Sequence, residues 1–235
     1  MWPTRQCIFM RPFVLVNVAM SADGKLSTRE RRQVKISGKD DFSRVDQIKA
    51  ASDAIMVGIG TVLADDPSLT VKSQTLIQWR KDKGLDEHPV RIVIDSRARI
   101  APDASVLIKG EGKRIVACSE RADESRIQIL KDRATIIRTG EEQVDLPRLM
   151  EELHGIGIRR LMVEGGGQLI WSLFEAGLVD EFSCFVGNMI IGGKDAPTPA
   201  DGKGFVMESA FTGLALREVK KMDEGILLVW NVEMH

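Results

Sequence analysis

The sequence predicts an α/β domain built on a mixed, mostly parallel sheet that is flanked by helices and ends in an antiparallel hairpin. Short runs rich in Val and Ile recur along the 235 residues, and polar stretches with helical spacing lie between several of them. A tight turn at 223–225 joins the last two apolar runs, as in a hairpin. The length suits one large core, so we expect residues 1–235 to form a single domain.

The N-terminal elements are expected to be a strand, a helix and a second strand. Residues 13–19 form the first apolar run, which ends before the turn signal Ala22-Asp23-Gly24. Residues 40–51 place apolar side chains on one side of a helix, and the chain enters this helix near Ser37. The buried-type run 54–57 then predicts the second strand.

The middle of the chain predicts a short helix and then alternating strands and helices. The glycines at 58 and 60 open the short helix, which ends before Pro67 because a residue that precedes proline avoids the helical conformation. Loop-forming residues dominate from there to the next strand. The elements expected after this loop are strands 91–94 and 114–117, helix 123–131, strand 134–137 and helix 146–155.

The C-terminal third predicts a strand, a glycine turn and a helix, followed by three more strands. Residues 160–163 form the strand and 168–176 the helix, with three consecutive glycines between them. A loop rich in Gly, Pro and Asp spans 192–204. The last three strands are expected at 181–187, 213–220 and 226–232.

The charge balance argues against a nucleic-acid partner. The sequence holds 33 basic and 34 acidic residues, whereas proteins that bind polyanions through counterion release carry a basic surplus. The one dense basic stretch, 29–32, predicts a solvated loop, with phosphate contact as the alternative. No segment approaches the roughly 18 apolar residues of a membrane span, and residues 1–11 lack the pattern of an export signal. We therefore expect a cytoplasmic protein without a membrane partner.

The cysteines are expected to be small buried side chains. Cys7, Cys118 and Cys184 are widely separated and no CxxC pair occurs, whereas a zinc site or a disulfide framework needs more thiols at closer spacing. Such scattered thiols fit a reducing compartment. No resident metal is predicted.

Two glycine turns carry the clearest chemical signal. In Glu164-Gly165-Gly166-Gly167, glycines at a strand-to-helix junction let the backbone approach an anion while the N–H groups of the helix start point at it. A phosphate or pyrophosphate fits there, and a plain tight connection is the alternative. Gly58-Ile59-Gly60-Thr61 is the second turn, where the Thr61 hydroxyl either donates to a phosphate or caps the helix. Neither turn matches GxGxxG or a P-loop.

Charged residues near these turns have two interpretations each. Asp65-Asp66-Pro67 places two carboxylates beside a rigid turn, where they bind a metal, orient a ribose hydroxyl or cap the turn, and local evidence favours turn chemistry. A hard-cation site needs more oxygen ligands than this stretch supplies. Lys49 and Lys72, taken alone, are solvated surface lysines.

Several other reaction classes lack their motifs. The sequence has no GxSxG elbow, no HExxH, and no HxE with PCxxC for the zinc of a nucleotide deaminase. Its histidines are His88 in a polar loop, His154 near a helix end and the C-terminal His235. A histidine general base is therefore not expected.

Four segments of the chain form a recognisable set in this order: 17–25, 58–70, 91–96 and 164–167. Together they resemble the reductases of riboflavin biosynthesis over about residues 12–232. The resemblance is closest to the stand-alone archaeal form and extends to the C-terminal half of the bacterial bifunctional deaminase-reductases. It implies a dihydrofolate-reductase-like fold, usually a homodimer, that binds NADPH along the carboxyl ends of the central strands. The chain departs from the bacterial pattern at Val34, where those enzymes tend to carry a tryptophan, and in lacking their zinc domain.

The same resemblance assigns site residues by position. Gly58 joins the cofactor set from its place in the second glycine turn, and the assignment to substrate lifts both lysines above the reading of solvated surface residues. The positions that fall where the family contacts NADPH are Ala19, Thr61, Asp65, Ser96, Gly165, Gly166 and Gly167. Those that fall where it contacts the phosphorylated substrate are Lys49, Leu69, Lys72 and Glu164.

The implied reaction reduces the ribosyl group of a phosphorylated diaminopyrimidine ribosylamine to a ribityl group. A ring-opened imine at ribose C1′ receives hydride from the nicotinamide, so the protein's part is to position the two reactants and to exclude water. No catalytic acid stands out, and Glu164 and Asp65 are the candidates. The rival interpretations are a reductase of the same fold acting on the deaminated pyrimidine or a pterin, and a non-catalytic nucleotide-binding module.

Overall fold

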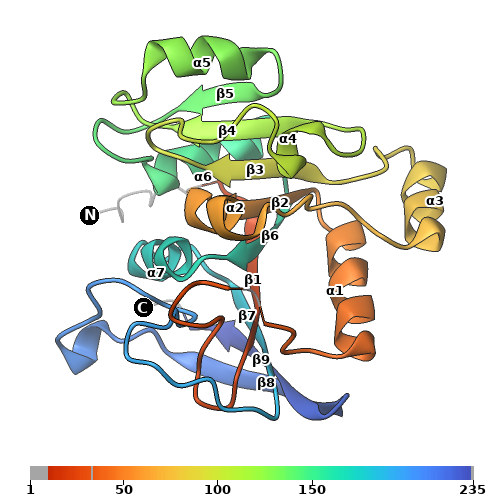
Figure 1. Cartoon of the computed structure of the whole chain (residues 1–235), viewed down its shortest axis with the longest axis vertical. Coiled ribbons are helices and arrows are strands. Elements are labelled where there is room, and N and C mark those ends of the chain that lie inside the picture. Colours follow the sequence, from red (N-terminus) through yellow and green to blue (C-terminus); the bar gives the residue numbers. More distant parts are fainter. Residues whose placement is uncertain (1–9, 33, 234–235) are drawn as a thin grey trace, which may run out of the picture.

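Nine strands form one sheet in the computed structural model, which describes residues 10–32 and 34–233 (Figure 1). The strand order is β5-β4-β3-β2-β6-β1-β7-β9-β8. All neighbours from β5 to β7 are parallel, and β9 pairs antiparallel with both β7 and β8. The strands are β1 Phe13–Met20, β2 Ala54–Gly58, β3 Val90–Ile94, β4 Arg114–Cys118, β5 Thr135–Arg138, β6 Arg160–Gly165, β7 Glu181–Val186, β8 Leu214–Met222 and β9 Gly225–Val232.

Helices cover both faces of this sheet, as the alternating pattern predicted. The mixed, mostly parallel sheet and its C-terminal antiparallel hairpin are confirmed. The helices are α1 Lys39–Ala51, α2 Ile59–Asp65, α3 Gln74–Asp82, α4 Ser105–Ile108, α5 Glu124–Lys131, α6 Leu146–Gly155 and α7 Gly167–Glu175, with a 3₁₀ turn at Glu208–Ala210.

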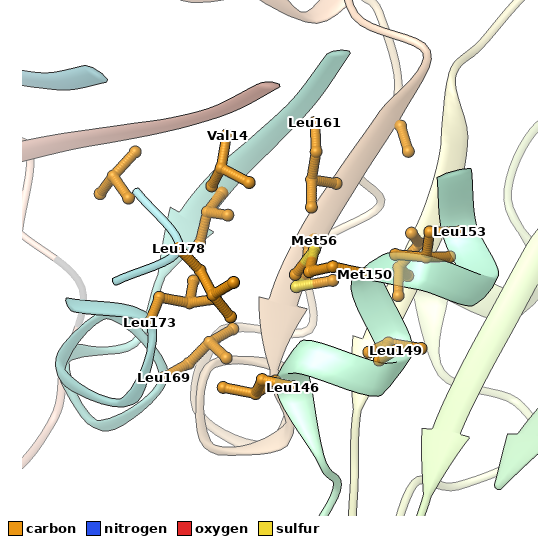
Figure 2. Close-up of a cluster of buried hydrophobic side chains, with 14 of the residues drawn as sticks. Val14, Met56, Leu146, Leu149, Met150, Leu153, Leu161, Leu169, Leu173 and Leu178 are labelled. Atoms are coloured by element: carbon orange, nitrogen blue, oxygen red, sulfur yellow. The ribbon is translucent and has the colours of Figure 1, made fainter. Parts of the chain in front are cut away.

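The first core lies between the sheet and helices α6 and α7. Figure 2 shows Leu149 and Leu153 of α6 and Leu173 of α7 pointing toward the central strands, where Met56 and Leu161 meet them. All five side chains are fully shielded from solvent. Burying one such side chain stabilises the fold by roughly 1.5–3 kcal/mol, so this layer fixes the strands whose ends build the site.

The second core lies on the opposite face, under helices α2, α4 and α5. Ile59 and Val62 of α2 pack there with Val57 of β2, and Leu130 of α5 completes the cluster farther along the sheet. The central strands are therefore buried on both faces, which explains their continuous rather than alternating apolar runs.

Helix α1 is capped by a residue far away in sequence. We expected the chain to enter the helix near Ser37, but it begins at Lys39, and Gly38 offers no side chain for capping. The carboxylate of Asp223, in the β8–β9 turn, accepts hydrogen bonds from the backbone N–H groups of Asp40 and Asp41 at 3.1 and 3.0 Å. A carboxylate at a helix N-terminus satisfies free donors and complements the dipole.

The expectation of a continuous loop after Pro67 is wrong, because α3 lies within it. Its sequence shows little apolar periodicity, and its support comes from elsewhere. Ser73 caps its start by accepting from the Leu76 N–H at 3.4 Å. The buried Arg80 guanidinium donates to the carbonyl of Ala50, at the end of α1, at 2.7 Å. Helix α3 is thus fastened to α1 by contacts that no local pattern reports.

The cysteine and surface predictions have separate outcomes. Cys118 and Cys184 are buried and free, as expected, and Cys7 lies outside the described residues. The basic stretch 29–32 is exposed and lies outside any helix or strand. Across residues 10–32 and 34–233, no helix has both the length and the apolar content to span a bilayer.

Candidate active site

A cleft opens at the carboxyl edge of the sheet, where β1, β2 and β6 are neighbours. We call it the glycine cleft, after the two turns that form its floor, 58–61 after β2 and 165–167 after β6. Its volume is about 370 Å³. Eight of the predicted site residues line it: Ala19, Gly58, Thr61, Asp65, Glu164, Gly165, Gly166 and Gly167.

The two turns face each other at close range. A Cβ atom on Gly166 would lie 3.2 Å from the Thr61 hydroxyl oxygen, and Gly165 has a φ of 138°, which L residues rarely adopt. No side chain caps the start of α7 at Gly166. Backbone N–H groups at a helix start without such a cap suit an anion. The N–H groups at this helix start thus have no side-chain cap, and the Asp201 carboxylate lies close to Gly167.

Asp65 and Asp66 are neighbours with different tasks. Asp65 lines the glycine cleft, and burial raises the pKa of its carboxyl. Asp66 has a left-handed backbone and accepts from the hydroxyl and the backbone N–H of Ser105, each at 2.7 Å, which lowers its pKa. The role in stabilising the turn, which local evidence favoured for both residues, thus belongs to Asp66 alone.

Lys49 and Glu164 form an ion pair beside the cleft. Lys49 lies near the end of α1, Glu164 is the residue before the glycine turn, and their Nζ and Oε1 atoms are 2.7 Å apart. The exposed fractions of the two side chains are only 15% and 18%. Both positions were expected to contact substrate, and the fold brings them together from residues 115 positions apart in sequence.

A second cavity, the lysine groove, runs between α1 and α3 with a volume of about 770 Å³. Lys49 and Lys72 line it. The Lys72 ammonium donates to the hydroxyl oxygens of Thr70 at 2.7 Å and Ser68 at 2.8 Å. Burial lowers the Lys72 pKa, and the charge of Lys49 lowers it further. The two lysines therefore line one groove, close enough for the charge of Lys49 to act on Lys72.

The loop that follows β1 and the loop that follows β7 are fastened together beside the cleft. The Asp23 carboxylate accepts from the Ser21 hydroxyl at 2.5 Å and from the N–H groups of Ile191 and Gly192 at 3.0 and 2.7 Å. These hydrogen bonds, with Ser21 first, lower its pKa to about 2. The turn signal at 22–24 thus ties the 187–204 loop to the end of β1.

Comparison with known proteins matches nearly the whole chain. A family model described as the RibD C-terminal domain matches residues 12–228. The 2,5-diamino-6-ribosylamino-4(3H)-pyrimidinone 5′-phosphate reductase of Archaeoglobus fulgidus is 47% identical over 216 residues, covering 92% of this chain and 96% of that one. The protein of the same name from Methanothermobacter thermautotrophicus is 42% identical, covering 95% and 100%.

The chain belongs to the RibD C-terminal domain family. A solved pyrimidine reductase-like protein from Corynebacterium diphtheriae has the same fold, with a TM-score of 0.83 at 18% identity over 95% of this chain and 93% of that one. The dihydrofolate-reductase-like fold that the resemblance implied is thereby confirmed for this member of the RibD C-terminal domain family.

Two residues assigned through the RibD C-terminal domain family lie apart from both cavities. The Ser96 hydroxyl, after β3, accepts from the Val144 N–H at 3.1 Å and so holds the loop before α6. Leu69 is only 2% exposed and has a positive φ of 53°, so its side chain belongs to the core under α2. Any ligand contact at Leu69 must therefore come from its backbone.

Two supporting residues escaped the sequence analysis. The buried Asp46 carboxylate accepts from the N–H groups of Lys72 and Ser73 at 2.8 Å each, which fixes the backbone that carries Lys72. Phe42, although 54% exposed, lines both the glycine cleft and the lysine groove. Asp46 gave no local signal, because the N–H groups from which it accepts lie 26 and 27 residues away in sequence.

Proposed function

We propose that this protein reduces the ribosylamino group of 2,5-diamino-6-ribosylamino-4(3H)-pyrimidinone 5′-phosphate to the ribitylamino form, with NADPH, in riboflavin biosynthesis. The observation that carries the proposal is that two relatives of this name match at 47% and 42% identity over almost their whole length. The paired glycine turns and the adjoining lysines supply the binding chemistry that such a reaction needs.

The residues of the glycine cleft fit a dinucleotide. Gly166 leaves open the space beside Thr61 that a Cβ would fill, so a pyrophosphate can approach the start of α7. In this proposal the backbone of 165–167, the Thr61 hydroxyl and Gly58 hold the phosphates, while Ala19 and Asp65 contact the rest of the cofactor. When bound, the reduced nicotinamide supplies a hydride to C1′ of the substrate.

The lysine groove fits the phosphorylated end of the substrate. Lys72 places an ammonium beside the hydroxyls of Ser68 and Thr70, and a phosphate can replace these neutral partners with a charge-assisted interaction. Lys49 and Glu164 then lie between this phosphate and the glycine cleft. The protein's part is to hold the sugar in register and to exclude water.

Enzyme assays with purified protein test the proposal. We expect substrate-dependent loss of NADPH absorbance with the diaminopyrimidine compound, slower turnover with its deaminated form, and none with a pterin. Equal or faster oxidation with the deaminated compound would assign the enzyme to the other order of steps. NADPH binding by fluorescence without substrate-dependent oxidation would identify a non-catalytic nucleotide-binding module.

We further propose that residues 1–235 work as one reductase domain of a cytoplasmic homodimer, without nucleic-acid or membrane partners. Support for the dimer comes from one face of the C-terminal hairpin, where β8 is an edge strand. Contiguous exposed apolar side chains on an edge strand favour association with a second copy. The exposed residues of this face are Leu214, Leu216, Val219 and Ile226.

Sedimentation of the wild type and Leu216→Glu tests the dimer. We expect the wild type to sediment as a dimer at micromolar concentration and the variant, whose carboxylate would be buried without a partner, as a monomer. A monomeric wild type would refute this part of the proposal and leave the reductase assignment untouched.

A further inference from the structure

The 187–204 loop forms one side of the glycine cleft and lies against the start of α7. The Asp201 N–H donates to the Gly167 carbonyl at 3.1 Å, and both Asp201 and Pro197 line the cleft. A Cβ atom on Gly167 would lie 2.3 Å from the Thr198 carbonyl oxygen and 2.8 Å from Asp201 Oδ2. The third glycine of the turn after β6 is therefore needed for the close approach of this loop.

Packing against α7 holds the loop in place on the other side of Asp201. Gly202 has a φ of 149°, and a Cβ atom on it would lie 2.2 Å from a ring carbon of Trp171, so its backbone rests directly on that side chain. Trp171 is only 6% exposed, and its ring centroid lies 4.7 Å from that of Phe205. Because Asp201 directly precedes Gly202, these contacts limit where its carboxylate can lie.

The two carboxylate oxygens of Asp201 have different surroundings. Oδ1 accepts from the Thr198 N–H at 3.0 Å and from the Thr198 hydroxyl at 2.7 Å. Among the residues that the structure describes, none donates a hydrogen bond to Oδ2. An ionised carboxylate accepts hydrogen bonds and cannot donate them. The cleft therefore presents an acceptor without a partner beside the start of α7.

An acceptor at this place suits one part of a dinucleotide and repels another. The phosphates carry negative charge, whereas the ribose hydroxyls are donors that a carboxylate recognises. The adenosine ribose of NADPH carries a phosphate on its 2′ position, and a carboxylate beside that position would favour NADH. The ribose next to the nicotinamide keeps both of its hydroxyls, so it is the part of NADPH that fits the Asp201 carboxylate.

We propose that Asp201 accepts hydrogen bonds from the hydroxyls of the nicotinamide ribose and so fixes this half of the cofactor in the glycine cleft, an assignment that rests on the proposed function for the identity of the cofactor. Glu164, which we assign to the substrate, lines the same cleft. The ribose held by Asp201 is thus the one joined to the ring that must meet the substrate.

Equilibrium binding of two ligands tests this role. NADPH contains both halves of the cofactor, whereas adenosine 2′,5′-bisphosphate contains only the adenosine half. Fluorescence titration measures the first affinity and calorimetry the second. We expect Asp201→Asn to weaken NADPH binding about 10-fold, because charge-assisted hydrogen bonds become neutral ones, and to leave the affinity for the bisphosphate unchanged. NADH has the same nicotinamide ribose, so its affinity should fall by the same factor.

Two control variants separate the carboxylate from the loop that carries it. Asp195→Asn removes an exposed carboxylate of the same loop that lines neither cavity, and it should bind both ligands as the wild type does. Thr198→Val removes the hydroxyl that bonds to Oδ1 but keeps the Asp201 carboxylate, and it should retain most of the NADPH affinity. An equal loss in Thr198→Val and Asp201→Asn would mean that Asp201 only holds the loop, and would overturn the proposal.

Three further results in Asp201→Asn would overturn the proposal. They are an unchanged NADPH affinity, an equal loss of affinity for the bisphosphate, and a gain in NADPH affinity relative to NADH, which would place the carboxylate beside the 2′-phosphate. Each of them leaves the reductase assignment standing. A wild-type protein that binds neither NADPH nor NADH would instead refute the proposed function, and the role of Asp201 with it.

Discussion

The glycine cleft and the lysine groove adjoin each other but are built from different materials. The floor of the cleft is backbone: two glycine turns in which a Cβ on Gly166 would make a tight contact, 3.2 Å, with the Thr61 hydroxyl oxygen. The groove carries charged side chains among apolar and neutral ones, and its Lys72 is held by hydroxyls and by the backbone hydrogen bonds that Asp46 accepts. A site built from backbone recognises an anion through its shape and fixed N–H dipoles, whereas a site built from charged side chains recognises it through titratable charge.

This difference determines how the glycine cleft and the lysine groove respond to substitutions and to pH. Added bulk should damage the glycine cleft, and its backbone contacts with an anion should be insensitive to alkaline pH, because amide N–H groups do not titrate there. Removed charge should damage the lysine groove, which tolerates changes of shape because its cavity, about 770 Å³, is wide. Binding of the cofactor in the cleft and binding of the substrate in the groove can therefore be disrupted independently.

The largest expected effect comes from bulk in the cleft. Gly166→Val places a branched side chain against Thr61 and across the start of α7, so NADPH affinity should fall by about 100-fold, or roughly 2.8 kcal/mol. Fluorescence titration with NADPH measures it. Gly155→Val, at the end of α6 where a Cβ meets nothing within 4 Å, is the control and should bind normally. Unchanged affinity in Gly166→Val would place the cofactor elsewhere.

A smaller effect is expected from removing charge in the groove. Lys72→Ala should raise the KM for the phosphorylated substrate about 10-fold, or ~1.4 kcal/mol, while kcat and NADPH affinity change little, because a lysine near a phosphate acts as a point charge. Steady-state kinetics separate the two constants. Lys83→Ala removes a lysine that lies over Trp79, outside both cavities, and should leave KM unchanged. A selective loss of kcat in Lys72→Ala would contradict a binding role.

The contrast between the cleft and the groove also explains which parts of the site could be predicted from the sequence. The glycine cleft was predictable because its residues are contiguous: each turn directly follows a strand, and neighbouring parallel strands end at one edge. Most strands and helices were predictable for the same reason, since the buried runs of β2 and β6 and the apolar face of α6 are local patterns.

The lysine groove was harder to predict, because the residues that contact one another there are distant in sequence. No spacing rule links Lys49 with Glu164, Asp46 with the backbone of Lys72, or Arg80 with the end of α1. Helix α3 was missed for this reason, and its neighbours rather than its own pattern hold it in place. The lysines entered the prediction only through resemblance to a family, and the assignment of Leu69 did not foresee that its side chain is buried.

The smallest expected effect is a pH dependence of the substrate KM that is confined to the lysine groove. The pKa of Lys72 is lowered by burial and then by Lys49, so its ammonium is lost as pH rises through a value below the usual 10.5. Substrate KM should therefore rise in an alkaline window that opens below pH 10.5, by at most the roughly tenfold effect of removing the charge.

NADPH affinity, measured over the same window, should stay flat, because the amide donors of the glycine cleft keep their protons. Lys72→Arg isolates the cause, since a guanidinium remains charged throughout the range and should remove most of the rise in KM. A rise of equal size in Lys72→Arg would assign the titration to another group. A parallel fall in NADPH affinity would mean that the cleft and the groove share a titrating residue, and the distinction between a backbone site and a charge site would then be wrong.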